Sequence, residues 1–453
     1  MRHLSLTRRT FMIGSGLYVL ALLLIHGSVL GGVQREAVRI AGPDARPCLG
    51  TLWLPDAPKA VLVLGHGVSS NQGVMAAIAH AFARNDYAVA ALDFWGHGRS
   101  RERFDWDSNE AQLMAWFDWS RSRFPALPVA YMGHSMGGAA GDAALARGAS
   151  LDAFISLGML PGRLTDTPTL IAAGRFEELF TPEQARSRAG EDADVLISPY
   201  SNHALETWDP VLIRGMTGWL NAALGFGGRP VFPWLRFAAL LFGVALGCVA
   251  APALAGCALV WTRRPPWSGA SQHTDRRWSL NPYRIAGRLL GGAPGPPLRS
   301  TAPFYIAALQ GLLFSALVIV LLWLVLSVHL FAFCLLHPER WLVWLILLPL
   351  LGPFIVADVW ALERLAPANA WKRFWIAALT RAAPLLVLAI GLRFVPGLSF
   401  LGMMLGIGAF VFVMLSLAHG FAAHGARDYR AGAVASAVLF TWVIAFWFPL
   451  AAG

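Results

Sequence analysis

A serine flanked by glycines is the feature of this sequence that points most directly to chemistry. Gly133, Ser135 and Gly137 form a Gly-x-Ser-x-Gly pattern within GHSMGG (133–138). The pattern lies between an apolar run typical of a buried strand and a helix-like segment. In a sharp strand-to-helix turn, small neighbours leave room for a strained serine whose hydroxyl projects above the sheet. The pattern therefore predicts a nucleophilic serine, and the alternative is a glycine-rich turn without chemistry.

Further stretches resemble the α/β-hydrolase superfamily of serine esterases and lipases. LGHGVSSN (64–71) is similar to the oxyanion loop of that family, and LDFWGHGRS (92–100) resembles its Asp-x-x-Gly-His-Gly-x-Ser stretch. Ser135, an acidic pair and His203 follow one another in the family's order of nucleophile, acid and histidine. The resemblance covers about 190 of the 453 residues. It implies a serine hydrolase and does not specify a substrate.

The resemblance also implies a catalytic triad with Ser135 as the nucleophile. A free serine hydroxyl is too weak a nucleophile near neutral pH, so a neighbouring base must accept its proton. His203, in PYSNHALETWD (199–209), stands where the family has its histidine. We expect His203 to be this base, and the alternative is a structural, hydrogen-bonded histidine.

The acid of the triad is ambiguous in this sequence. AAGRFEELFTP (172–182) resembles the strand end where the family usually has an aspartate, and the matching position is Glu177, with Glu178 beside it. We favour Glu177 over Glu178, and Asp209 is a remote third option. Whichever carboxylate acts would hold the histidine tautomer and stabilise the imidazolium.

Backbone groups complete the site that the resemblance implies. The oxyanion hole would consist of the N–H groups of Val68 and Met136, which would aim at the developing negative oxygen. Gly133 and Gly137 would form the nucleophile elbow. His66 and His97 lie in the two loop stretches that match the family, and we expect both to be structural.

Apolar runs alternate with helix-like segments across the middle of the chain. Such alternation is typical of a mostly parallel sheet with helices on both faces. Only about seven residues separate DAFISLGML (152–160) from PTLIAAG (168–174), so an α/β-hydrolase-like fold without a lid insertion is predicted. The expected strands are 60–66, 87–93, 128–134, 152–158, 168–174 and 193–199, and the clearest helices are 73–85, 107–123 and 136–148.

Composition separates this region from the rest of the chain. The chain is 56% apolar and only 14% charged, whereas soluble domains average about 45–50% and about 25%. Its net charge of +10 resolves into −4 for residues 35–230 and +14 for the remainder. Because the basic excess lies beside apolar runs, it indicates membrane topology and argues against nucleic acid as a partner.

The apolar runs predict a multi-pass membrane protein with three parts. Residues 1–34 contain an apolar segment (11–31), which we interpret as an uncleaved anchor; TRRTFM also resembles a twin-arginine signal, so a cleaved signal is the alternative. Residues 35–230 form the hydrolase-like domain. Residues 231–453 form a six-span, all-α domain with a cytoplasmic loop over 262–302. The expected spans are 235–261, 304–335, 341–362, 375–395, 398–421 and 431–451.

Arginine placement orients these spans. With a cytoplasmic N-terminus, the short outer loops contain only Arg340 and Arg393. The hydrolase-like domain and the C-terminus are then expected outside the cytoplasm. The spans themselves are expected to lie in a bacterial plasma membrane. The inner segments contain Arg2, Arg8, Arg9, seven arginines in 262–302, Arg364, Lys372, Arg373, Arg427 and Arg430.

The sequence thus favours a membrane-anchored serine hydrolase that cleaves an ester, thioester or amide through an acyl-serine intermediate. Its expected partners are a small-molecule or lipid acyl substrate and membrane lipids, with no oligomeric state indicated. No cofactor and no metal site is predicted, because no metal-ligand spacing, P-loop or dinucleotide fingerprint is present. The alternatives are an acyltransferase with the same triad, and a transporter or scaffold whose hydrolase-like domain only binds a ligand.

The predicted topology can be tested with reporters fused after Gly453. Alkaline phosphatase should be active there, because the C-terminus is expected outside the cytoplasm, and green fluorescent protein should remain dark. A fluorescent fusion with inactive phosphatase would contradict the arginine-based orientation.

Overall fold

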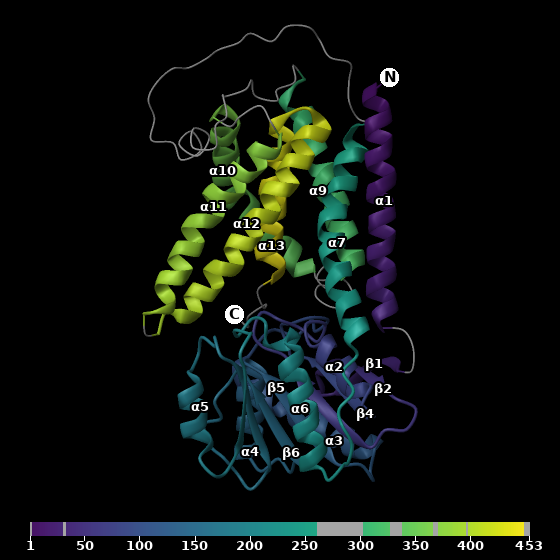
Figure 1. Cartoon of the computed structure of the whole chain (residues 1–453), viewed down its shortest axis with the longest axis vertical. Coiled ribbons are helices and arrows are strands. Elements are labelled where there is room, and N and C mark those ends of the chain that lie inside the picture. The colour runs from purple at the N-terminus through teal and green to yellow at the C-terminus, as the bar shows by residue number, and fades with distance from the viewer. Residues whose placement is uncertain are drawn as a thin grey trace. The chain divides into compact units, whose positions relative to one another are not determined.

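The computed structural model describes residues 2–29, 33–260, 302–326, 338–365, 370–395 and 397–447. Its internal contacts divide the chain into two compact units. The α/β unit contains Leu24–Leu241, and the helical unit contains Met1–Leu23, Phe242–Val325 and Glu339–Phe446. Figure 1 traces the elements of each unit. The cytoplasmic loop expected over 262–302 lies outside the described residues except for its last position.

The α/β unit is built on a mixed sheet of eight strands in the order β1-β2-β4-β3-β5-β6-β7-β8. Neighbours from β4 through β8 pair in parallel, whereas β2 is antiparallel to both β1 and β4. The six expected strands are all present. The strands are β1 (Gln34–Ala41), β2 (Pro47–Leu54), β3 (Ala60–Gly65), β4 (Tyr87–Asp93), β5 (Val129–His134), β6 (Ala153–Leu157), β7 (Thr169–Gly174) and β8 (Asp194–Ser198).

Helices cover both faces of this sheet, as the alternating pattern predicted (Figure 1). Along β3, Leu62 and Leu64 point to one face while Val61 and Val63 point to the other, because side chains alternate along a strand. The first face packs against α2 (Ala76–Ala83) and α6 (Pro210–Ala223). The second packs against α3 (Asn109–Arg123) and α4 (Met136–Ala146), with α5 (Pro182–Ala189) over β7 and β8.

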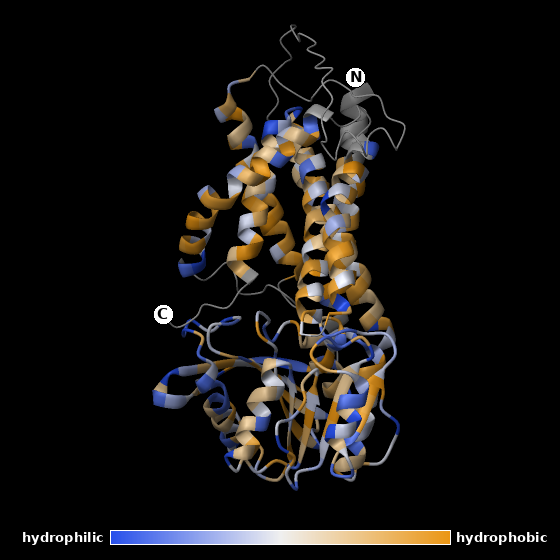
Figure 2. Cartoon of the chain, turned by 90° about the vertical axis from the view of Figure 1, so that its left-hand side faces the viewer, coloured by the Kyte–Doolittle hydropathy of each residue, from blue (hydrophilic) through white to orange (hydrophobic). Residues whose placement is uncertain are grey.

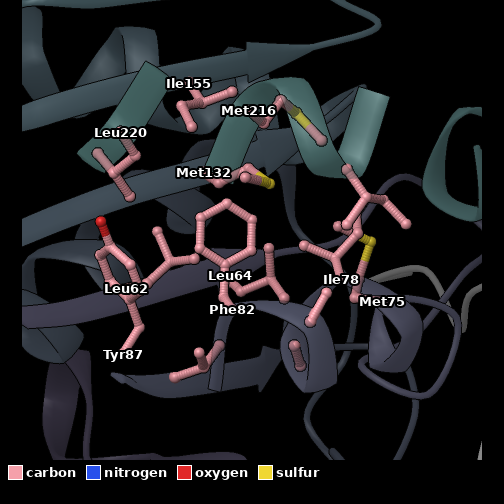
Figure 3. Packing of buried hydrophobic residues seen from close by; sticks show 14 of the residues in the cluster. Leu62, Leu64, Met75, Ile78, Phe82, Tyr87, Met132, Ile155, Met216 and Leu220 are labelled. Carbon is pink, nitrogen blue, oxygen red and sulfur yellow. The ribbon is translucent and has the colours of Figure 1, made fainter. Parts of the chain in front are cut away.

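Buried apolar side chains fill the core between the sheet and helices α2 and α6. Burying one such apolar side chain contributes about 1.5–3 kcal/mol relative to leaving it exposed. Tyr87 also lies in this core, and its hydroxyl donates to Asn221 Oδ1 over 2.8 Å, so the polar end of this side chain is satisfied. Figure 3 shows Leu62, Leu64, Met75, Ile78, Phe82, Tyr87, Met132, Ile155, Met216 and Leu220 packed together.

The loops at the carboxyl ends of the parallel strands share one edge of the sheet. Residues 158–168 connect β6 to β7 without a helix or strand. The prediction of a fold without a lid at this position is therefore confirmed. The segments after β3, β5, β7 and β8 lie at the same edge of the sheet, where they can form a site.

The helical unit contains long apolar helices. Among the described residues, six helices are long and apolar enough to span a membrane: Trp234–Leu259, Phe304–Leu326, Glu339–Glu363, Phe374–Arg393, Ser399–Ala426 and Tyr429–Phe446. Figure 2 shows apolar residues along these helices, whereas in the α/β unit they gather on the strands. The expected spans match these helices in position, except that residues 261, 327–335 and 448–451 lie outside the described residues. In the part of the chain that the structure describes, the long helices are α1 (Arg2–Val29), α7 (Trp234–Leu259), α9 (Phe304–Leu326), α10 (Pro338–Leu365), α11 (Ala370–Arg393), α12 (Ser399–Ala426) and α13 (Tyr429–Trp447).

Arg381 and His419 of the helical unit pair with acidic residues of another helix. Arg381 of α11 contacts Asp358 of α10 over 2.6 Å and donates to Ser416 Oγ of α12 over 2.9 Å. His419 of α12 lies 3.2 Å from Glu363 of α10. Ionisable groups between apolar helices are costly unless they are paired, so these contacts hold α10, α11 and α12 together.

Candidate functional site

Ser135 occupies a strained turn between β5 and α4. Its backbone has φ 53° and ψ −116°, a conformation that L-residues rarely adopt, and its side chain is largely buried. Two backbone hydrogen bonds hold the turn: Ser135 N donates to Leu157 O over 2.9 Å, and Ala139 N donates to Ser135 O over 3.1 Å. This is the geometry that the Gly-x-Ser-x-Gly pattern led us to expect.

The two glycines of the pattern make this turn possible. A Cβ at Gly133 would overlap the backbone of Gly137. A Cβ at Gly137 would lie 2.7 Å from the carbonyl oxygen of Gly65, at the end of β3. Small residues at both positions let the first turn of α4 pack against the ends of β3 and β5, next to the loop after β3.

The segments after β7 and β8 bring a glutamate and a histidine together. Glu177 Oε2 lies 2.9 Å from Nδ1 of His203, and both side chains are almost completely buried. The other oxygen, Oε1, accepts the N–H groups of Glu178 and Leu179, each over 2.8 Å. Burial would raise the pKa of Glu177, but the hydrogen bond and charge of His203, assisted by Glu206 and Leu179, hold that pKa below its usual value.

Glu178 points at the backbone of the histidine loop instead. One carboxylate oxygen accepts His203 N over 2.9 Å, and the other accepts Asn202 Nδ2 over 3.2 Å. Asp209 instead caps the start of α6, where its carboxylate accepts Val211 N over 2.8 Å. Of the three acidic residues considered from the sequence, only Glu177 is hydrogen-bonded to the imidazole of His203.

His134, which precedes Ser135 in the chain, lies against His203. The two imidazole centroids are 4.8 Å apart, and His134 Nε2 lies 3.1 Å from the carbonyl oxygen of His203. Burial, together with the charge of His203, holds the pKa of His134 well below its usual value, so His134 is neutral and its Nε2–H donates to that carbonyl. This contact brings the His203 loop to the strand end that carries Ser135.

A second buried glutamate adjoins the pair, and sequence reasoning missed it. Glu206, in the one-turn helix Glu206–Trp208, is completely buried, and its Oε1 accepts Gly174 N over 2.6 Å. Burial and the charge of Glu177 raise the pKa of Glu206 well above its usual value. Its position three residues after His203 was visible in HALE (203–206), but the pattern does not show that this carboxyl is buried.

The candidate oxyanion donors lie on the two segments that meet at the elbow. Met136 N–H is the first of α4, and such N–H groups have no partner within their helix. Val68 follows Gly67, where a Cβ would lie 3.1 Å from Ser135 Cβ. Met136 is thus next to Ser135 in the chain, and Val68 is next to a residue, Gly67, that lies close to Ser135.

Two further histidines stabilise the surrounding loops. His66 Nε2 accepts Phe94 N over 3.1 Å while Nδ1 donates to Gly67 O over 2.8 Å. His97 Nε2 accepts Ser69 N over 3.2 Å while Nδ1 lies 2.9 Å from Trp95 O. Burial lowers the pKa of His66 to about 4, so this ring stays neutral. Both rings hold backbone in place, as expected for structural histidines.

Three residues of the site are of metal-ligating types, and one nitrogen of each histidine is already hydrogen-bonded. His134, His203 and Glu206 each offer one ligand atom, and these atoms lie within 4.8 Å of one another. However, His203 Nδ1 is hydrogen-bonded to Glu177, and His134 Nε2 to the His203 carbonyl. While these two nitrogens donate hydrogen bonds, they cannot bind a metal ion.

The same region of the chain is similar to known hydrolases. Residues 56–160 match the family model described as serine aminopeptidase, S33. Monoglyceride lipase from Mus musculus is 34% identical over 110 residues, covering 23% of this chain and 36% of the relative. Monoacylglycerol lipase from Mycolicibacterium smegmatis is 34% identical over 95 residues, covering 19% and 33%. The chain thus spans about a third of the length of the curated relatives that it matches.

Solved structures also align with this chain. An α/β serine hydrolase without lid from Xanthomonas campestris aligns at 20% identity and a TM-score of 0.36, covering 42% of this chain and 94% of its own. A dienelactone hydrolase from Anabaena variabilis aligns at 22% identity and a TM-score of 0.36, covering 43% and 96%.

The strand order, the strained serine turn and the family match define the class of this region. The α/β unit has an α/β-hydrolase fold, as the sequence predicted. The family match over residues 56–160 lies within this unit and includes Ser135.

Gly158 gives a test of how tightly the cluster is packed. It has φ +63°, and a Cβ there would overlap Glu206 Oε2 and lie 3.1 Å from His203 Nδ1. Gly148 is a matched control, because its φ is +91° and nothing lies within 4 Å of a Cβ. Both alanine variants bear the left-handed strain of about 1–2 kcal/mol. Gly158→Ala should lose about 1–3 kcal/mol more through overpacking.

The comparison is made by pulse proteolysis of the full chain in detergent across a urea series. We expect Gly158→Ala to become protease-sensitive at clearly lower urea than Gly148→Ala. Equal midpoints for the two variants would show that the cluster has room for an added methyl group.

Proposed function

We propose that this protein is a membrane-anchored serine hydrolase that cleaves carboxylic esters, and by extension thioesters or amides, through an acyl-Ser135 intermediate. The observation that supports this most strongly is the buried hydrogen bond between Glu177 and His203 beside the strained turn of Ser135. An acid, an imidazole and a serine in a strained turn on one sheet edge are the components of nucleophilic acyl transfer.

In the proposed first step, Ser135 Oγ attacks the carbonyl carbon while its proton passes to Nε2 of His203. The N–H groups of Met136 and Val68 donate to the oxygen that becomes negative; one such donor is typically worth about 2.7–4 kcal/mol of the barrier. Glu177 accepts Nδ1–H throughout, and its lowered pKa keeps it ionised beside the imidazolium. The tetrahedral intermediate then collapses, the C–O bond to the alcohol breaks, and the alcohol leaves with the proton from His203.

In the second step, water replaces the alcohol. His203 takes a proton from the water as its oxygen attacks the acyl carbon, and the bond to Ser135 Oγ breaks as Oγ regains a proton. The carboxylic acid is released, and the resting serine and neutral imidazole are restored.

The loops of the site support an apolar acyl substrate. Phe176 and Leu179, on either side of the two glutamates, are 50% and 46% exposed. Leu205, two residues after His203, is 58% exposed, and Tyr200 on the same loop is 75% exposed. Large exposed apolar side chains around a polar site favour substrates with hydrocarbon chains. Together with the lipase relatives, they lead us to propose a monoacyl lipid ester as the substrate class.

The proposed location is a membrane with the α/β unit outside the cytoplasm. Support comes from the six apolar helices and from the arginine distribution in the sequence. A bacterial plasma membrane fits this arrangement. An acyltransferase would use the same residues, and it is distinguished by whether the acyl group passes to water or to an added alcohol.

Removal of the nucleophile or the base tests this mechanism. Ser135→Ala and His203→Ala should each lower kcat/KM for p-nitrophenyl butyrate by about 10⁴-fold or more, because the two residues act as a unit. Ser122→Ala, at an exposed position on α3, is the control and should retain wild-type turnover. Wild-type activity in either site variant would exclude the acyl-Ser135 route.

The two adjacent glutamates offer a matched pair of variants. Glu177→Gln should lower kcat by about 10³–10⁴-fold, because an amide cannot hold His203 in the tautomer that accepts the serine proton. Glu178→Gln should lower kcat by less than about tenfold, because Glu178 bonds the backbone of the histidine loop and not the imidazole. A larger loss at Glu178 than at Glu177 would assign the acid role to Glu178.

A further inference from the structure

We propose that Glu206 is a positioning residue of this site: as a neutral carboxylic acid, it donates its O–H to the carboxylate of Glu177 and fixes that carboxylate against His203. This proposal rests on the proposed function, in which Glu177 orients the imidazole. The supporting observations are the burial of Glu206, its one satisfied oxygen, and the groups around the other oxygen.

The two oxygens of Glu206 have different surroundings. Oε1 accepts Gly174 N over 2.6 Å, at the end of β7. Oε2 occupies the space left by the missing side chain of Gly158, and a Cβ there would also lie 3.1 Å from His203 Nδ1. Glu206 Oε2 therefore lies near Nδ1 of His203, the nitrogen that Glu177 Oε2 contacts.

The surroundings of Oε2 offer no hydrogen-bond donor. Among the described residues, none donates to this buried atom. His134 Nε2 lies 3.5 Å away, but its proton is directed to the His203 carbonyl at 3.1 Å. Glu177, when ionised, can only accept. An ionised Glu206 would thus be a buried anion with a single hydrogen bond beside a second anion, which is strongly unfavourable.

A proton on Oε2 resolves both problems. It converts the oxygen into a donor for which Glu177 is the acceptor, and it removes the repulsion between the two carboxyl groups. The titratable groups that face Glu206 agree with this state, because Glu177 and Glu178 carry negative charge and His134 is neutral. Burial and the charge of Glu177 raise the pKa of Glu206 well above its usual value.

As a consequence, the two carboxylate oxygens of Glu177 would share four hydrogen-bond donors between them. Oε1 accepts the N–H groups of Glu178 and Leu179, and Oε2 accepts Nδ1–H of His203. The O–H of Glu206 adds a fourth donor, and the hydrogen bond between the two carboxyl groups lowers the pKa of Glu177. Glu177 is then held in one orientation without a second negative charge beside the imidazole.

Two variants of the full chain in detergent separate this role from simple packing. In Glu206→Gln, the amide oxygen can accept Gly174 N–H and the amide nitrogen can donate to Glu177. This variant should keep kcat within about threefold of the wild type. On the acidic side of the pH profile, its kcat/KM should fall at the same pH as in the wild type. Glu206→Leu fills the space without a donor and should lower kcat by about 10- to 100-fold with little change in KM.

Infrared spectroscopy gives a readout that does not depend on turnover. Near neutral pH the wild type should show the carbonyl stretch of a buried protonated carboxylic acid, and this band should be missing from Glu206→Gln. If no variant hydrolyses esters, the proposed function fails, but the band still tests the protonation of Glu206. If Glu206→Leu does not fold, Glu206→Gln still provides the band and the acidic limb.

Three results would overturn the proposal. The first is identical infrared bands in the wild type and Glu206→Gln. The second is an acidic limb that moves to lower pH in Glu206→Gln, which would show that a negative charge had been removed from beside the imidazole. The third is a folded Glu206→Leu variant with wild-type kcat.

Discussion

The buried hydrogen bond between Glu177 Oε2 and His203 Nδ1, 2.9 Å long, is the contact on which the rest of the site depends. It joins the segment after β7 to the segment after β8, so the parallel pairing of these strands sets the distance between the two residues. Glu178 and His134 reinforce it from both sides, because each is hydrogen-bonded to the backbone of His203. An ionised carboxylate is tolerated at this depth because backbone N–H groups and the imidazole supply its hydrogen bonds.

The strained turn of Ser135 meets this pair at the same sheet edge. Strain of this kind persists only where the surrounding structure over-determines the backbone. Here β3, β5 and β6 do so: Gly65 and Gly137 approach closely, and Ser135 N is bonded to Leu157 O at the end of β6. The apolar core on both sheet faces makes these strand ends rigid, while the short β6–β7 connection adds no lid above them.

The sequence predicted the parts of this fold that depend on local pattern. Apolar runs identified the six strands β3 to β8, and the small residues around Ser135 identified the turn. Strands β1 and β2 were missed, because β1 is a largely exposed edge strand with Arg35, Glu36 and Arg39. The choice between Glu177 and Glu178 depends on which neighbouring carboxylate turns toward the imidazole, and spacing does not determine that. Glu206 was missed because its importance comes from burial among groups distant in sequence, such as Gly158 and Gly174.

The central claim is that Ser135 is an activated nucleophile, and a covalent probe tests it most directly. The full chain in detergent would be treated with a fluorophosphonate and digested, and the modified peptide would be identified by mass spectrometry. The account predicts a single phosphonate adduct on Ser135, absent from a sample unfolded before labelling. No adduct, or an adduct on another serine, would contradict it and would favour an α/β unit that only binds a ligand.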